Sequence, residues 1–243
     1  MTDKKKTLTS KASTGALDDA SGADVETFLA RLAAAPKPGE AARGRLIFAL
    51  DATASRQPTW DKAARIQGDM FLAAAKVGRL DIQLCLYRGF GEFKVSPWLS
   101  EPQPLLRLMT SVSCRAGETQ IGKVLQHAVN EAQKQRVGAL VFVGDCVEED
   151  VDVLGARAGT LGTLGVPAFM FHEGRDLRAE FAFKEIARLT GGAYCQFDGA
   201  SANALRDLLC AVAVYAAGGR RALDRLAHQG TAVARIAHQL RER

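Results

Sequence analysis

The chain has 243 residues, of which 47% are hydrophobic and 24% are charged, a balance typical of globular proteins. No apolar run reaches the roughly 18 residues that a membrane-spanning helix needs, so a transmembrane protein is not expected. The formal net charge of +5 is uneven, because six arginines and only two acids fall between residues 219 and 243. The central part of the chain is close to neutral, which gives no support to nucleic-acid binding there.

The amino terminus and the cysteines bear on where the protein works. Residues 1–24 are polar, lack the apolar stretch of a secretory signal, and are expected to form a disordered arm. The five cysteines are odd in number and include no Cys-x-x-Cys pair, which favours free thiols over disulfides or a zinc site. They are Cys85, Cys114, Cys146, Cys195 and Cys210. The expected location is therefore a reducing compartment, the cytoplasm.

Apolar and amphipathic segments alternate along most of the chain. Residues 25–43 are expected to hold a short amphipathic helix and a linker rich in Pro and Gly. Apolar runs predict strands at residues 45–50, 80–87, 139–143, 166–171 and 194–197, with a short hairpin partner at 92–95. Helical spacing predicts helices at residues 60–77, 105–109, 117–132, 151–161, 181–189 and 204–217.

This alternation predicts the fold class. The strands are apolar throughout, as expected when helices cover both faces of a sheet. Residues 44–217 are therefore predicted to form an α/β domain with a doubly wound, mainly parallel sheet and one short antiparallel edge strand. Binding sites of such sheets form beyond the carboxyl ends of the strands. A basic helical extension is expected at residues 218–243, where packing on the body, oligomer formation and binding of an acidic partner or RNA are all open.

Small oxygen-bearing side chains gather at the predicted strand ends. Asp51, Thr53 and Ser55 occupy alternate positions directly after the first strand. Thr119 stands at a predicted helix start, and Asp145 follows another apolar strand. Two carboxylates and three hydroxyls suit a hard divalent cation such as Mg²⁺, and they leave coordination room for waters or an incoming carboxylate. The alternative for the first loop is that its side chains only bond nearby backbone.

In order and placement these residues resemble the von Willebrand factor type A (VWA) domain with a metal-ion-dependent adhesion site (MIDAS). The family motif is Asp-x-Ser-x-Ser followed by a distant Thr and a distant Asp, and here Thr53 stands at the first Ser position. The resemblance implies that Thr53 and Ser55 bind the metal directly, joined by Thr119 in the ligand-competent state. It implies that Asp51 and Asp145 act mainly through bound waters and hydrogen bonds. A partner's Asp or Glu would complete the coordination sphere.

Charged and titratable neighbours flank this predicted site. Arg56 would place a cation near the metal, where it would either weaken metal binding or recruit an acidic partner. The acidic run Glu148-Glu149-Asp150 is interpreted as a solvated helix start favoured by the helix dipole. His172, alone at a strand end, is interpreted as structural.

The leading functional hypothesis is a non-enzymatic cytoplasmic adaptor that grips an Asp or Glu of a partner protein through Mg²⁺, with Mn²⁺ or Ca²⁺ as alternative ions. A metal-assisted hydrolase ranks second, because no base stands beside the metal loops in the sequence. An aspartyl-phosphate phosphatase would need an Asp where Thr53 stands, and a dinucleotide site would need glycines after the first strand. An RNA-associated scaffold is the third hypothesis, and it rests on the arginine-rich C-terminal segment alone.

Overall fold

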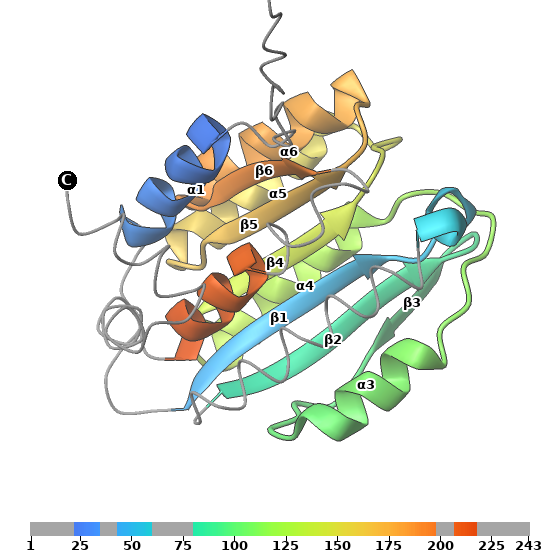
Figure 1. The fold of residues 1–243 in the computed structure, drawn as a ribbon, viewed down its shortest axis with the longest axis horizontal. Coiled ribbons are helices and arrows are strands. Elements are labelled where there is room, and N and C mark those ends of the chain that lie inside the picture. The colour runs from blue at the N-terminus through green and yellow to red at the C-terminus, as the bar shows by residue number, and fades with distance from the viewer. Residues whose placement is uncertain (1–21, 35–42, 60–79, 198–206, 218–243) are drawn as a thin grey trace, which may run out of the picture.

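A computed structural model describes residues 22–34, 43–59, 80–197 and 207–217, whose strands form one six-stranded sheet in the order β3-β2-β1-β4-β5-β6 (Figure 1). The strands are β1 (Gly44–Asp51), β2 (Leu80–Arg88), β3 (Glu92–Val95), β4 (Ala139–Gly144), β5 (Ala168–Glu173) and β6 (Ala193–Phe197). Every neighbouring pair is parallel except β2 and β3. The predicted mainly parallel sheet with one antiparallel edge strand is therefore confirmed.

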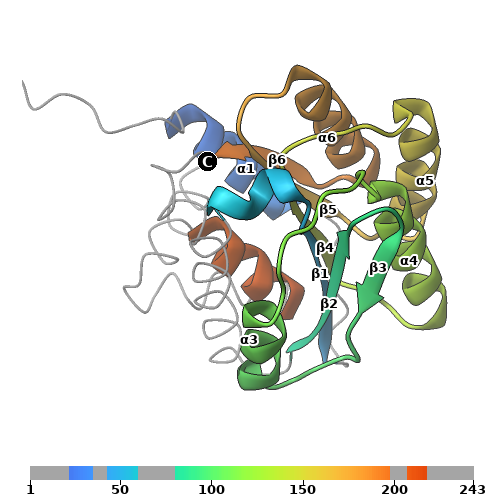
Figure 2. The same cartoon turned by 90° about the vertical axis from the view of Figure 1, so that its right-hand side faces the viewer.

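Helices cover both faces of this sheet. They are α1 (Gly22–Ala34), α3 (Pro102–Thr110), α4 (Ile121–Lys134), α5 (Val151–Thr163), α6 (Leu177–Thr190), the 3₁₀ helix η1 (Ala54–Thr59) and a helical segment at 207–217. Figure 2 shows α4, α5 and α6 on one face, with α1, α3 and the segment 207–217 on the other. This is the doubly wound arrangement that the alternation of strands and helices predicts.

The burial of β1 shows why its sequence is apolar throughout. Leu46, Phe48 and Leu50 lie in the core cluster that includes α1 and residues 208–216. Ile47 and Ala49 lie in the second cluster, which is built on α4, α5 and α6. Successive strand residues point to opposite faces, so a strand covered on both sides needs apolar residues at every position.

The helix expected near residue 25 is observed as α1, and it is an integral part of the packed body. Phe28 and Leu32 are fully buried. The ring centroid of Phe28 lies 5.9 Å from that of Phe169 and 5.4 Å from that of Phe171, both on β5. The body therefore begins before residue 44, where the sequence pattern had placed the start of the domain.

Helix α6 begins at Leu177, four residues before the predicted start at 181. Asp176 caps it, since Asp176 Oδ1 accepts a hydrogen bond from the backbone N–H of Ala179 at 2.6 Å. The apolar pattern misses this first turn because its one buried residue is the small Ala179, whereas Leu177 is 79% exposed on the solvent side of the helix.

Several predicted elements lie outside the described residues. They are the helix at 60–77, the start of the helix at 204–217, the arm up to residue 21 and the extension at 218–243. Among the helices that the structure does describe, none has the length and apolar character needed to cross a bilayer.

Candidate metal centre

The loops after β1 and β4 leave the same edge of the sheet side by side. Leu50 and Val143 are register partners in the parallel pair β1–β4. A Cβ atom added to Gly144 would lie 3.5 Å from Asp51 Cβ, so the ends of the two strands lie close together. The charge of Asp145 also contributes to a raised pKa of Asp51, after the larger effect of burial. The structure thus brings together the two predicted carboxylates.

Asp51 is fully buried. Its Oδ1 atom accepts a hydrogen bond from the backbone N–H of Thr53 at 2.7 Å. Its Oδ2 atom is buried and makes no hydrogen bond with the residues that the structure describes. Burial raises the pKa of Asp51 above its ordinary value, while hydrogen bonds from Thr53 act in the opposite direction. The strand therefore ends on a buried carboxylate of which one oxygen accepts a hydrogen bond and the other accepts none from the described residues.

A tight turn brings the two hydroxyls of the first loop together. The Oγ1 atom of Thr53 lies 3.0 Å from Oγ of Ser55. The 3₁₀ helix η1 begins between them at Ala54, and the N–H of Arg56 donates to the carbonyl of Thr53 at 3.1 Å. Thr53 is buried, whereas Ser55 is exposed. The hydroxyl pair therefore extends from the buried Asp51 toward the surface.

Thr119 is tied to the loop that carries Asp145. The N–H of Thr119 donates to Glu148 Oε2 at 2.8 Å, and the N–H of Glu148 donates to Thr119 Oγ1 at 3.0 Å. Thr119 lies two residues before the first helical residue of α4, slightly outside the predicted helix start. On the other side of the site, the N–H of Arg115 donates to the carbonyl of Ala52 at 3.1 Å. All three predicted loops therefore meet at one edge of the sheet.

The acidic run after Asp145 is only partly the solvated helix start that its sequence indicates. Asp150 does cap α5, accepting hydrogen bonds from two N–H groups of its first turn. Glu149, however, accepts hydrogen bonds from the N–H groups of Ile121 and Gly122 at 2.5 and 2.9 Å. The interpretation is wrong for Glu149, because α4 has no side-chain cap of its own and Glu149 supplies one from another loop.

The Glu149→Ala variant tests whether Glu149 caps the start of α4. It leaves two N–H groups at the start of α4 without acceptors, and we expect a loss of about 2 kcal/mol in the free energy of unfolding. For a chain of this size that corresponds to a fall of roughly 4–8 °C in Tm. Thermal unfolding followed by circular dichroism measures it, with the exposed Asp152→Ala on α5 as the control. A Glu149→Ala protein as stable as the wild type would show that these hydrogen bonds do not stabilise the fold.

Arg56 is buried and forms an ion pair across the top of the sheet. Its Nη1 atom lies 3.0 Å from Oε2 of Glu173, and the two side chains are 0% and 13% exposed. Arg56 lowers the pKa of Asp51, as the smallest of the causes acting on that group. The predicted cation beside the site is therefore present, but it is too buried to recruit an acidic partner at the surface.

His172 is a packed core residue, in agreement with the structural interpretation. It is fully buried, and its Nδ1 atom lies 2.9 Å from the hydroxyl of Tyr194. Its ring meets that of Phe183 edge to face at a centroid distance of 5.4 Å. Burial lowers the pKa of His172 below its ordinary value.

Tyr87 is a neighbour of the site that no sequence pattern singles out, because it lies in an apolar strand run like its neighbours. It is the register partner of Asp51 on β2 and is fully buried. Burial, and then the nearby Asp51 carboxylate, raise the pKa of Tyr87 well above its ordinary value. The two side chains interact, yet no hydrogen bond of ordinary geometry from the described residues satisfies Tyr87 Oη or Asp51 Oδ2.

The donor set fits a divalent ion held by hydroxyls and water. Asp51 Oδ2 and Asp145 Oδ1 are both buried without a hydrogen bond to the described residues. Such buried polar atoms are rare and costly, and a hard cation with its bound waters would satisfy both. In the part of the chain that the structure describes, no group of three or more His, Cys, Asp or Glu side chains could hold a metal ion. A metal here would therefore depend on the hydroxyls as well as the two carboxylates.

Comparisons with known proteins establish the fold. No protein-family model matches the sequence, and no curated protein matches it. Among solved structures, a von Willebrand factor type A protein from Catenulispora acidiphila has a TM-score of 0.59 at 13% identity, covering 71% of this chain and 43% of its own. The SpRpn10 VWA domain has a TM-score of 0.55 at 15% identity, covering 68% of this chain and 93% of its own.

A further similar structure is proximal thread matrix protein 1 from the mussel byssus with a zinc-occupied MIDAS motif. Its TM-score is 0.55 at 15% identity, and the match covers 71% of this chain and 45% of that protein. This chain therefore spans less than half of two of these three proteins. The described residues have the fold of a VWA domain, and identities this low establish the fold alone.

Proposed function

We propose that this protein is a metal-dependent interaction module, an adaptor of the cytoplasm that binds an acidic residue of a partner protein through Mg²⁺. The observation that carries the proposal is a pair of buried carboxylate oxygens, Asp51 Oδ2 and Asp145 Oδ1, which form no hydrogen bond to the described residues where three loops meet. The predicted site residues are Asp51, Thr53, Ser55, Thr119 and Asp145.

The roles of the residues follow from their chemistry. Thr53, Ser55 and Thr119 would offer neutral hydroxyl ligands, and Asp51 and Asp145 would bind the waters of the ion. Neutral ligands donate little charge, so the ion keeps its attraction for a further carboxylate, that of a partner's Asp or Glu. Mn²⁺ and Ca²⁺ take similar oxygen ligands and are alternative ions. The zinc-occupied MIDAS motif of the mussel protein supports the use of a divalent metal.

The two other functions considered from the sequence gain no specific support. A metal-assisted hydrolase needs a base near the ion, and His172, at the end of β5, is buried and packed against Phe183 and Tyr194. An RNA-associated scaffold rests on residues 218–243, which lie outside the described part of the chain. Non-enzymatic binding of a protein partner remains the proposal.

Calorimetric titration of Mg²⁺ and Mn²⁺ into the whole chain tests this proposal. We expect saturable binding by the wild type and none by Asp145→Asn, because the variant loses one of the two charges that balance the ion. Asp152→Asn removes an exposed carboxylate from the first turn of α5 and is the matched control, with binding expected to persist. Equal metal binding by wild type and Asp145→Asn, with both proteins folded, would contradict the proposal.

A further inference from the structure

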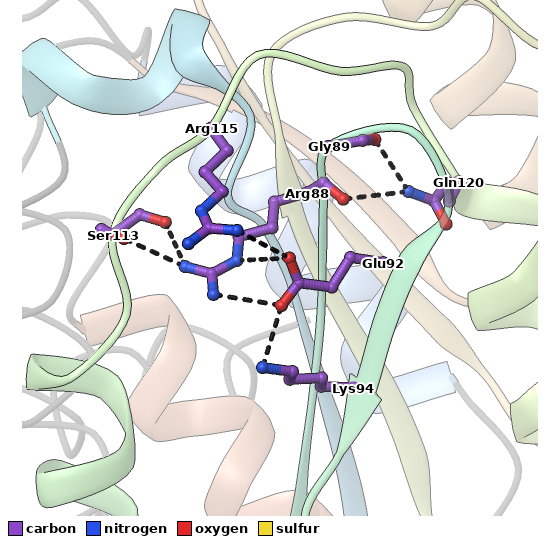
Figure 3. Close-up of polar contacts among 7 residues, drawn as sticks. All are labelled: Arg88, Gly89, Glu92, Lys94, Ser113, Arg115 and Gln120. Atoms are coloured by element: carbon purple, nitrogen blue, oxygen red, sulfur yellow. Dashed lines mark hydrogen bonds and ion pairs between the residues drawn. The ribbon is translucent and has the colours of Figure 1, made fainter.

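Three cations surround one carboxylate on the β2–β3 hairpin (Figure 3), and we call this group the basic rim: Arg88, Lys94 and Arg115 around Glu92. Arg88 donates from Nε and Nη2 to the two carboxylate oxygens of Glu92, at 3.0 Å each. Lys94 Nζ lies 2.9 Å from Glu92 Oε1, and Arg115 Nη1 lies 3.7 Å from Glu92 Oε2. Three positive charges thus share one negative charge.

The basic rim adjoins the candidate metal centre. Arg115 and Thr53 are bridge partners, and the N–H of Arg115 donates to the carbonyl of Ala52 at 3.1 Å. Cys114, the residue before Arg115, is affected by charges of both the metal centre and the rim. Burial raises the pKa of Cys114 to about 11, the charge of Asp51 raises it further, and that of Arg88 lowers it. A ligand bound at the metal centre therefore lies within reach of the rim.

The cations of the rim differ in how firmly they are held. Arg88 is 11% exposed and also donates from Nη1 to the carbonyl of Ser113 at 2.6 Å, so its place is fixed. The side chains of Lys94 and Arg115 are 62% and 63% exposed. Arg115 makes the longest of the contacts with Glu92, and it is the cation most able to turn toward an incoming anion.

The carboxylate at the centre of the rim stays ionised. Hydrogen bonds, first from Arg88 and then from Lys94, lower the pKa of Glu92 to about 2. Even with this carboxylate ionised, three cations against one anion leave the rim with a net positive charge. An excess of cations at a binding edge favours acidic partners and increases their rate of association.

We propose that the basic rim binds a second carboxylate of the partner, so that the partner is an acidic peptide segment with two acids and not a single Asp or Glu. This inference rests on the proposed function, in which the first acid completes the metal coordination. An extended peptide advances about 3.3 Å per residue, so a second acid about two to four residues from the first can reach Arg115. The guanidinium of Arg115 would then form a charge-assisted pair with it.

Two synthetic peptides test the inference on the whole chain in the presence of Mg²⁺. The first, Ac-Gly-Asp-Gly-Gly-Glu-Gly-NH2, carries two acids, and the second carries Gln in place of Glu. By NMR titration we expect the wild type to bind the two-acid peptide roughly three- to tenfold more tightly, with a smaller preference at higher salt. In Arg115→Gln this ratio should fall close to one, while Lys184→Gln on α6 should keep the wild-type ratio.

The outcomes separate this inference from the proposed function. If both peptides bind equally to the wild type in a Mg²⁺-dependent manner, the basic rim is not a binding site, although the metal-dependent function stands. If neither peptide binds with Mg²⁺ present, the proposed function and this inference both fail. If Arg115→Gln keeps the preference, the second acid is bound elsewhere and Arg115 is not its partner.

Discussion

In buffer containing EDTA, the Asp51→Asn variant will unfold at a higher temperature than the wild type. Asp51 is a fully buried carboxylate whose Oδ2 atom makes no hydrogen bond with the described residues. Asn keeps the acceptor for the N–H of Thr53 and removes the buried charge. We expect a gain of about 1 kcal/mol in the free energy of unfolding, roughly 2–4 °C in Tm for a chain of this size.

The pH dependence of this gain has a definite sign. Burial raises the folded-state pKa of Asp51, so the folded state binds its proton more tightly than the unfolded state does. The stability that protonation of Asp51 confers is present at low pH and is lost as the pH rises through the folded-state pKa. The Tm difference between variant and wild type should therefore shrink as the pH falls from 7 through that pKa toward the lower pKa of the unfolded state. A difference that grows on acidification would contradict this account.

The same variant should lose its response to metal. A ligand present at 100 times its Kd stabilises a folded protein by about 2.7 kcal/mol. We expect added Mg²⁺ to raise the Tm of the wild type and of Asp152→Asn, and to leave that of Asp51→Asn unchanged. If Asp51→Asn is more stable without metal and its Tm does not respond to Mg²⁺, the buried carboxylate lowers the stability of the wild type but is needed for metal binding.

The Arg56→Met variant should show the largest loss of stability. It removes one member of an ion pair whose side chains are 0% and 13% exposed, and leaves the Glu173 carboxylate without this partner. Because Glu173 keeps some contact with solvent, we expect a cost of about 2–3 kcal/mol, near the lower end for buried pairs, or roughly 4–12 °C in Tm. Urea unfolding of the wild type and the variant measures this cost.

Two controls define the effect of Arg56. Arg188→Met breaks an exposed ion pair with Glu185 on α6, and it should leave the Tm unchanged. The double variant Arg56→Met/Glu173→Met should recover part of the lost stability, since it leaves no unpaired carboxylate. An Arg56→Met protein as stable as the wild type would show that the pair contributes nothing.

Removing a cation beside Asp51 should also strengthen Mg²⁺ binding several-fold.

The sequence carries most of the fold because its signals are local. The apolar run that ends at Asp51 and the one before Asp145 both predict buried strands, and both strands are present as β1 and β4. Parallel neighbours present their carboxyl ends at one edge of the sheet, so the two acids were expected to meet there. The helical periodicity of Ile121 to Ala132 likewise corresponds to α4, which begins at Ile121.

The surroundings of the site could not be predicted because they depend on side chains from different loops. The carboxylate of Glu149 reaches the N–H groups of Ile121 and Gly122 across the site, and no local pattern indicates that pairing. Arg56 and Glu173 meet only because β1 and β5 end at the same edge of the sheet. The predicted start of α6 was four residues late, since periodicity reports only the buried face and Ala179 is the one buried residue of the first turn.

The most direct test of the central claim is the anomalous scattering of Mn²⁺ in crystals of the whole chain soaked with that ion. If the candidate metal centre binds a divalent ion, we expect one strong peak where the loops of Asp51, Thr119 and Asp145 meet. This peak should lie within coordination distance of the hydroxyls of Thr53 and Ser55. Its absence from crystals of Asp51→Asn soaked in the same way would complete the result. A wild-type map with no peak at this place under saturating Mn²⁺ would contradict the account.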